Sequence, residues 1–381
     1  MIKPIEHFAV NWMDGMKISQ KHFDAQESFF IDTSRDVSSL ALNRFNYGLL
    51  PLDKKHEKDT MFQVYNTATN DVQLTIKNCN AVTAAGYRIS LSDYQTSVKA
   101  LASSINEDKQ GIGEDHYILI AVNPFDKVAF GDLDPEEVPP RQPNTLPKYY
   151  VELVQASVID TSHTGGNYLI MGKVNLNSNL ITADEDFIPP CTSIRSHPRL
   201  IAYHTGFGGK MRSLQQYAFK IIQKTPSAQQ NAAFAPQVKS LCSTLINYFA
   251  DTYFQFRNII PEQAPVYMID VFARQALHLY NATQAMPSIA LEEMLNYAYE
   301  WSNVAPNTLL NQLSTVAEIN YDHNNCGKHF QDVENLLNSL ERILEKLSEL
   351  DYIGQRKESI VVTEKDITPT TKVVAGWSVL D

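Results

Sequence analysis

Three side chains that can bind metal stand at equal spacing late in the chain, at His323, Cys326 and His329, with Asp322 beside the first. At intervals of three residues they would lie roughly on one face of a helix, where imidazole and thiolate groups could bind zinc. Structural zinc sites usually have four ligands in closely spaced pairs, however, and Gly327 is typical of a helix end. The pattern favours a helix end, and we expect no metal and no cofactor. A hydrolase that uses the same three side chains is a further alternative.

A glycine-rich segment, His204-Thr-Gly-Phe-Gly-Gly-Lys-Met211, is the next candidate for chemistry, because phosphate-binding loops are rich in glycine. The Walker pattern requires Gly at the position of His204 and Ser or Thr at the position of Met211, so the segment does not match it. We interpret it as a flexible hinge, since Gly adopts backbone angles closed to other residues. The sequence also has no Gly-x-Ser-x-Gly, His-Glu-x-x-His or paired-carboxylate motif. We therefore expect that the chain is not an enzyme.

The composition argues against two classes of protein. With 381 residues, the chain exceeds what a single core usually organises, so we expect two or three domains of ~100 to 200 residues. No stretch approaches the ~18 to 20 apolar residues that cross a bilayer, which argues against direct membrane insertion. A formal net charge of -11 without a cluster of Lys and Arg argues against binding to nucleic acid. The most basic stretch, Lys54–Lys58, contains an acid and suits a solvated loop.

The cysteines and the first residues indicate a cytoplasmic protein. Cys79, Cys191, Cys242 and Cys326 are far apart, with no Cys-x-x-Cys pair, as expected of reduced thiols. The opening residues lack the charged start and apolar stretch of an export signal. A cytoplasmic location is the expectation that follows.

Residues 61 to 177 have the alternation of a β domain. Val72, Leu74 and Ile76 alternate with polar residues, a pattern that buries one face of a sheet. Further strands are expected at Met61–Tyr65, Tyr87–Leu91, Tyr117–Val122, Tyr149–Ile159 and Tyr168–Val174. Because no long helical pattern lies between them, we predict an antiparallel sandwich. Six prolines and several acids between Pro124 and Pro147 predict a long loop there.

After Pro198 the apolar residues recur at the 3.6-residue period of helices. Pro261, Pro265, Pro287 and Pro306 fall at spacings that suit helix ends. We expect a bundle of about four helices between residues 200 and 325.

A last helix has the most regular apolar pattern in the chain. Its members, at spacings of 4, 3, 4 and 3, are Val333, Leu337, Leu340, Leu344 and Leu347. Such a heptad stripe suits either a self-associating coiled coil or a helix packed on its neighbours. Beyond Gly354, the segments Ser359–Thr363 and Lys372–Ala375 indicate a small β-hairpin.

The opening segment Val10–Phe23 pairs an early Trp and Gly with a later His-Phe step. The fixed positions of this register are Trp12, Asp14, Gly15, Met16, Ile18, His22 and Phe23. The segment resembles the Trp-x-Glu-Gly-Met-x-Leu-x-Pro-Gln-His-Phe segment of TssK, the trimeric baseplate subunit of type VI secretion systems. The sequence departs from it at Asp14, Gln20 and Lys21, where the family has Glu, Pro and Gln. A second segment, Asp186-Phe-Ile-Pro-Pro-Cys191, resembles the one that closes the N-terminal β domain of the family.

With this resemblance, the patterns predict an α+β multidomain fold. An N-terminal antiparallel β-sandwich shell would span residues 1–197, and a helical bundle neck would span residues 198–328. A reduced C-terminal head, made of the heptad helix and the hairpin, would span residues 329–381. The family usually has a larger head, so the resemblance implies a system with a different envelope anchor.

The resemblance also implies a function. The chain would be a structural adaptor and a homotrimer, which links wedge subunits of the TssF and TssG type to an envelope or membrane anchor. Its baseplate would be cytoplasmic and docked at the inner membrane. The wedge contact would involve Trp12, Asp14, Gly15, Met16, His22 and Phe23. The trimer seam would involve Val333, Leu337, Leu340, Leu344 and Leu347.

Two alternatives stand beside this interpretation. Trp12, Met16, Ile18 and Phe23 could be ordinary core residues of a strand and the helix that follows. The whole chain could instead be a receptor-binding protein of a phage or phage-like particle, which recognises cell-surface saccharide. A saccharide receptor would have exposed aromatic side chains at the C-terminal tip, where this sequence offers few beyond Tyr352 and Trp377.

Overall fold

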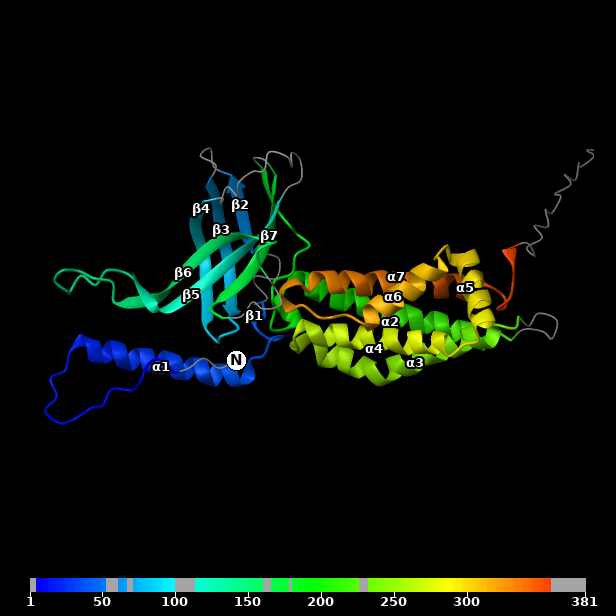
Figure 1. Ribbon diagram of the computed structural model, residues 1–381, viewed down its shortest axis with the longest axis horizontal. Helices are drawn as coiled ribbons and strands as arrows, with labels where there is room; N and C mark the ends of the chain where they lie inside the picture. The colour runs from blue at the N-terminus through cyan, green and yellow to red at the C-terminus, as the bar shows by residue number, and fades with distance from the viewer. Residues whose placement is uncertain are drawn as a thin grey trace, which may run out of the picture.

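The computed structural model describes residues 5–52, 61–66, 71–99, 114–159, 166–177, 180–225 and 232–357. The basic stretch Lys54–Lys58, the expected hairpin at Ser359–Thr363 and Lys372–Ala375, and Trp377 lie outside these residues. The molecule is elongated: two β-sheets form one end, a bundle of helices forms the other, and an N-terminal helix, α1 (Gln20–Ala41), lies beside the sheets (Figure 1). None of the described helices is long and apolar enough to span a bilayer.

The first sheet is built around its longest strands. It comprises β1 (Gly48–Leu49), β2 (Phe62–Asn66), β3 (Asp71–Val82) and β4 (Arg88–Lys99), and β3 pairs antiparallel with each of the others. The predicted alternation is confirmed, because Val72, Leu74 and Ile76 of β3 are all buried. A period of two places them on one face of the strand, toward the core.

The second sheet packs on the first. It comprises β5 (Glu114–Phe130), β6 (Asn144–Gln155), β7 (Tyr168–Asn177) and β8 (Leu180–Ala183), in the antiparallel order β6-β5-β7-β8. A Cβ atom at Gly172 of β7 would lie 2.5 Å from the Phe62 ring of β2, so the two sheets approach each other closely there. The antiparallel sandwich predicted from the sequence is confirmed.

The ribbon formed by β5 and β6 is longer than predicted. Because β5 continues to Phe130 and β6 begins at Asn144, the loop comprises residues 131–143 and not 124–147. The prolines are tolerated because Pro124 falls where the register shifts and Pro147 lies on β6, an edge strand. In Figure 1 the ribbon projects beyond the sandwich on the side of α1.

Six helices form the bundle within the described residues. They are α2 (Pro198–Gln223), α3 (Ala235–Asn258), α4 (Pro265–Gln284), α5 (Ser288–Ser302), α6 (Pro306–Ala317) and α7 (Gly327–Glu349). Pro265 and Pro306 are first residues of helices, as predicted, where a missing N–H breaks no hydrogen bond. The helix α7 packs along α2 and α6. The bundle is therefore larger than the predicted four helices, and it includes the heptad helix that was expected in a separate head.

The glycine-rich segment His204–Met211 is not a hinge, because it lies inside α2. Phe207 and Met211 are buried, and a Cβ atom at Gly208 would lie 3.2 Å from the Phe256 ring of α3. Gly208 therefore lets α2 and α3 approach closely. The prediction was wrong because packing between helices overrides the weak helix propensity of Gly.

Candidate protein-binding surface

The potential metal ligands late in the chain have structural partners. His323 precedes α7, and its Nε2 atom donates a hydrogen bond to the backbone O of Tyr47, at 2.9 Å. The Nε2 atom of His329 accepts a hydrogen bond from the backbone N–H of Asp322, at 3.1 Å. Cys326 is fully buried, and burial raises the pKa of its thiol to about 12. Within the residues that the structure describes, no three His, Cys, Asp or Glu side chains gather where they could hold a metal ion.

The same segment forms the joint between the sandwich and the bundle. The Tyr47 hydroxyl donates to Oδ1 of Asn324, at 2.8 Å, beside the hydrogen bond from His323. The next residue, Gly48 of β1, has a φ of +113°, and a Cβ atom there would lie 2.0 Å from the backbone O of Pro190. The Pro-Pro segment therefore packs directly on β1, and the turn that precedes α7 is hydrogen-bonded to the residue that precedes β1.

At the other side of the sandwich, residues 5–19 form an N-terminal arm that is held on α1. The Asp32 carboxylate accepts hydrogen bonds from the backbone N–H groups of Glu6 and His7, at 3.3 and 3.1 Å. The His7 Nδ1 atom lies 3.0 Å from the same carboxylate oxygen. The His7 ring also stacks on Phe125 of β5, with 4.5 Å between ring centroids. The arm is therefore tied to both α1 and the ribbon.

The side of α1 that faces the sandwich is charged. Asp32 and Arg35 are only 2% and 4% exposed, and their side chains form an ion pair at 3.1 Å. Burial alone would raise the pKa of Asp32, but the hydrogen bonds from His7 and the charge of Arg35 hold it below its ordinary value. Burial alone would lower the pKa of Arg35, but hydrogen bonds to Asp36 and Tyr87 raise it. Both partners are therefore ionised in the folded protein.

The opposite side of α1 is apolar and exposed. Phe23, Phe30, Val37 and Leu40 are between 58% and 78% exposed. Their spacing of seven, seven and three residues places them along one stripe of the helix. The usual arrangement of a surface helix is thus partly inverted: an ion pair is buried and large apolar side chains are exposed, although Ile31 also packs against the core. Exposed apolar patches of this kind mark sites of interaction.

The arm extends the apolar side of α1. The Trp12 ring centroid lies 6.0 Å from that of His22 and 6.4 Å from that of Phe23, so the three rings form a cluster at the start of the helix. We name the large exposed apolar side chains of the arm and α1 the N-terminal apolar surface, which comprises Ile5, Phe8, Trp12, Met13, Ile18, Phe23, Phe30, Val37 and Leu40.

Other predicted contact residues shape the arm. The backbone N–H of Met16 donates to the backbone O of Met13, at 3.2 Å, and closes a turn. The third residue of that turn is Gly15, whose φ of +77° is a conformation that favours Gly. The Nδ1 atom of His22 accepts a hydrogen bond from the backbone N–H of Ser19, at 3.1 Å, and so caps the start of α1. The turn and the His22 cap thus fix the backbone that carries the aromatic cluster.

The structure brings the six predicted contact residues together in one place. Trp12, His22 and Phe23 meet in the cluster, and Asp14 is exposed on the turn beside Met16. Since Trp12 and Phe23 are 47% and 60% exposed, they are not core residues of this chain. Sequence reasoning missed the remainder of the stripe on α1. The seven-residue spacing that begins at Phe23 was the signal that could have found it, and the missed residues are Phe30, Val37 and Leu40.

The heptad stripe of α7 lies inside the bundle. Four of its members are buried and one is half-buried: Val333, Leu337, Leu340 and Leu347 in the first group, Leu344 in the second. The helix packs against α2, α5 and α6 of the same chain. The structure therefore has the second of the two alternatives, a helix packed on its neighbours. This corrects the expectation of an intermolecular seam at these five residues.

Comparison with known proteins gives likenesses of structure only. No protein-family model and no curated protein matches the sequence. A crystal structure of TssK is similar to this chain with a TM-score of 0.49 and 14% identity, over 88% of this chain and 72% of that one. A structure of TssK from the type VI secretion system of EAEC, in complex with nanobody nb18, gives a TM-score of 0.44 and 13% identity, over 84% and 98%. A baseplate complex from a type VI secretion system gives a TM-score of 0.47 and 11% identity, over 89% of this chain and 100% of that one. These values do not assign a function.

Proposed function

We propose that this chain is a TssK-like structural subunit of a type VI secretion baseplate. It acts by attachment and not by catalysis, and it assembles as a homotrimer. It connects wedge subunits of the TssF and TssG type to an envelope anchor, in a cytoplasmic baseplate docked at the inner membrane. The register of residues from Trp12 to Phe23 supports the family, and the exposure of that segment supports a binding role.

The observation that carries the proposal is the N-terminal apolar surface. Burial of a large apolar side chain is favourable by roughly 1.5 to 3 kcal/mol relative to its exposure to water. A partner that covers these side chains is therefore bound more tightly. Trp and other aromatic side chains dominate such contacts, because they bury much area for little lost side-chain entropy. The arm is already fixed on α1 by Asp32, which reduces the entropy lost on binding. We assign the wedge contact to this surface.

The two ends of the molecule suit an adaptor. The helix α1, which carries most of the N-terminal apolar surface, lies beside the sandwich, whereas the described segment that follows α7, residues 350–357, lies at the far end of the bundle (Figure 1). In the proposal the wedge is bound at the first end and the envelope anchor at the second.

The proposal is tested by combining Trp12→Ala with Phe23→Ala and measuring capture of co-expressed wedge subunits by native mass spectrometry. Truncation of an interface hot spot costs at least about 2 kcal/mol, so capture should weaken by about 30-fold or more. The melting temperature should stay near that of the unchanged protein, because both side chains are exposed. Phe254→Ala is the matched control, since Phe254 is 70% exposed but lies on α3 in the bundle.

The same spectra test the assembly. A trimer that captures wedge subunits, and loses them only in the Trp12 and Phe23 variant, supports the proposal. A folded variant that captures them as well as the unchanged protein would show that this surface is not the wedge contact. A monomer that captures none would overturn the baseplate function and favour a saccharide-binding receptor protein.

A further inference from the structure

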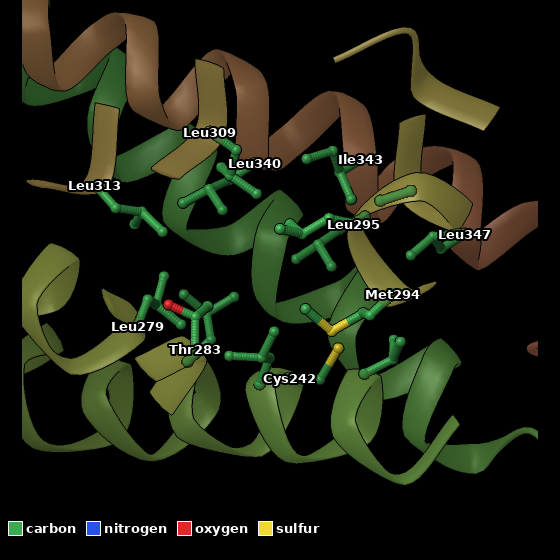
Figure 2. Close-up of a pocket in the computed structure, with 15 residues that line it drawn as sticks. Cys242, Leu279, Thr283, Met294, Leu295, Leu309, Leu313, Leu340, Ile343 and Leu347 are labelled. Carbon is green, nitrogen blue, oxygen red and sulfur yellow. The ribbon is translucent and has the colours of Figure 1, made fainter. Parts of the chain in front are cut away.

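The helical bundle holds a partly open apolar cavity of about 70 Å³ that the proposed function does not use. Side chains from α3, α4, α5, α6 and α7 line it, and Figure 2 shows those of Cys242, Leu279, Met294, Leu295 and Leu313 around the space. Every helix of the bundle except α2 contributes to the lining.

The lining offers almost no partner for a polar guest. The one hydroxyl among the lining side chains, that of Thr283, donates to the backbone O of Tyr280, at 2.7 Å. Burial raises the pKa of the Cys242 thiol to about 12, so the thiol stays uncharged. A buried water requires two to four polar partners, which this cavity does not supply. The sulfur atoms of Cys242 and Met294 are polarizable and suit apolar contacts.

The size and shape of the cavity limit the guest. An engineered cavity of about 150 Å³ lined by similar side chains holds benzene or xenon, and the present cavity has roughly half that volume. Its lining on α7 extends from Leu340 to Leu347, which is about 10 Å along the helix axis at ~1.5 Å per residue. The space is therefore too small for an aromatic ring, and its lining follows about two turns of α7.

We propose that this cavity is a binding site for a small, uncharged, apolar molecule, such as a short linear hydrocarbon. The guest regains the dispersion contacts that the lining side chains lack around an empty space. Because it binds the folded state alone, it also stabilises the bundle by mass action. This places a ligand site at the centre of the bundle, remote from the N-terminal apolar surface.

The test uses the full chain with ¹³C-labelled methionine methyl groups, observed by NMR under xenon and then under n-butane. Met294 lines the cavity, whereas Met211 and Met268 are buried in the same bundle away from it and serve as internal controls. We expect a saturable shift of the Met294 signal with either gas, no shift of the control signals, and no shift with benzene. The Met294→Leu variant identifies the signal.

Two variants sharpen the result. Ala298→Leu adds volume to the lining and should abolish the Met294 response to xenon while the protein stays folded. Leu295→Ala enlarges the cavity and should make the Met294 signal respond to benzene, which keeps the test decisive if the first variant does not fold. An absent or unsaturable Met294 shift, or equal shifts at Met211 and Met268, would overturn the proposal.

Discussion

At the scale of single residues, His323 shows how one buried imidazole connects two parts of the protein. Its Nε2 atom donates to the backbone of Tyr47, and its Nδ1 atom, 3.1 Å from the hydroxyl of Tyr321, is left to accept. Burial lowers the pKa of His323 to about 4, so the ring is neutral near pH 7. A protonated ring would carry two N–H donors and would lose the acceptor that the Tyr321 hydroxyl faces.

We predict that stability decreases as the pH falls from about 6.5 to 4. The pKa of a histidine is ~6.5 in an unfolded chain and about 4 for His323 in the folded one, so the unfolded chain binds more protons in this window. The stability that neutral His323 contributes is fully present above pH 6.5 and is lost through this window, with a magnitude of about 3 kcal/mol. His197, whose pKa burial also lowers to about 4, contributes in the same window. Urea unfolding at pH 7 and pH 4.5 measures the change.

The His323→Gln variant isolates the contribution of one histidine. The difference in unfolding free energy between pH 7 and pH 4.5 should be smaller in this variant than in the unchanged protein, and the part that remains should come from His197 and from His329, whose pKa burial also lowers. An equal difference in the two proteins would show that His323 does not take up a proton on unfolding.

At the scale of elements, the sequence predicted the type of each helix or strand better than it predicted what packs against it. Alternation in β3 and the 3.6-residue period after Pro198 predicted the sandwich and the bundle correctly. The strands β1 and β8, of two and four residues, are too short to show alternation. An apolar stripe, moreover, does not reveal what covers it. The stripe of α7 is buried in its own chain, whereas the stripe of α1 is exposed. On α1 the buried residues are Asp32 and Arg35, and the periodicity of apolar residues does not predict the burial of a charged pair.

The placement of α7 leads to a prediction about Leu340. Because Leu340 is buried against the other helices of the bundle, Leu340→Ala should reduce the free energy of unfolding by about 2 to 5 kcal/mol. Leu344→Ala, at a half-buried position of the same helix, is the matched control and should cost less. Denaturant unfolding measures both. Equal losses, or an oligomer that dissociates while its subunits stay folded, would argue for a seam between chains after all.

At the scale of the whole molecule, the sandwich and the bundle are closely packed against each other where they join. Gly48 of β1 lies against Pro190, and a Cβ atom at Gly327 of α7 would lie 3.0 Å from the backbone O of Asp186. The hydrogen bond between Tyr47 and Asn324 spans the same contact. Backbone therefore packs against backbone at the joint, and a side chain added there has no flexible neighbour to displace.

We predict that Gly48→Ala lowers the melting temperature strongly. The φ of +113° is unfavourable for Ala, and its Cβ atom would lie 2.0 Å from the backbone O of Pro190, so we expect a loss of about 2 to 3 kcal/mol or more. Gly15→Ala is the control, since Gly15 also has a positive φ, +77°, but no heavy atom within 4 Å of an added Cβ. Its cost should be about 1 to 2 kcal/mol. Calorimetry measures both, and similar melting temperatures would contradict a tight joint.

The partly inverted helix α1 has a consequence for how this protein can change over generations. Because the buried ion pair of Asp32 and Arg35 attaches α1 to the sandwich, the exposed side chains of this helix contribute little to the stability of the fold. A substitution at Phe30 or Val37 should therefore leave the stability of the chain nearly unchanged, and in the proposed assembly it would change only the affinity for the partner. Selection can then change this surface one residue at a time as the sequence of its partner changes, and no compensating substitution is needed to restore the stability of the subunit.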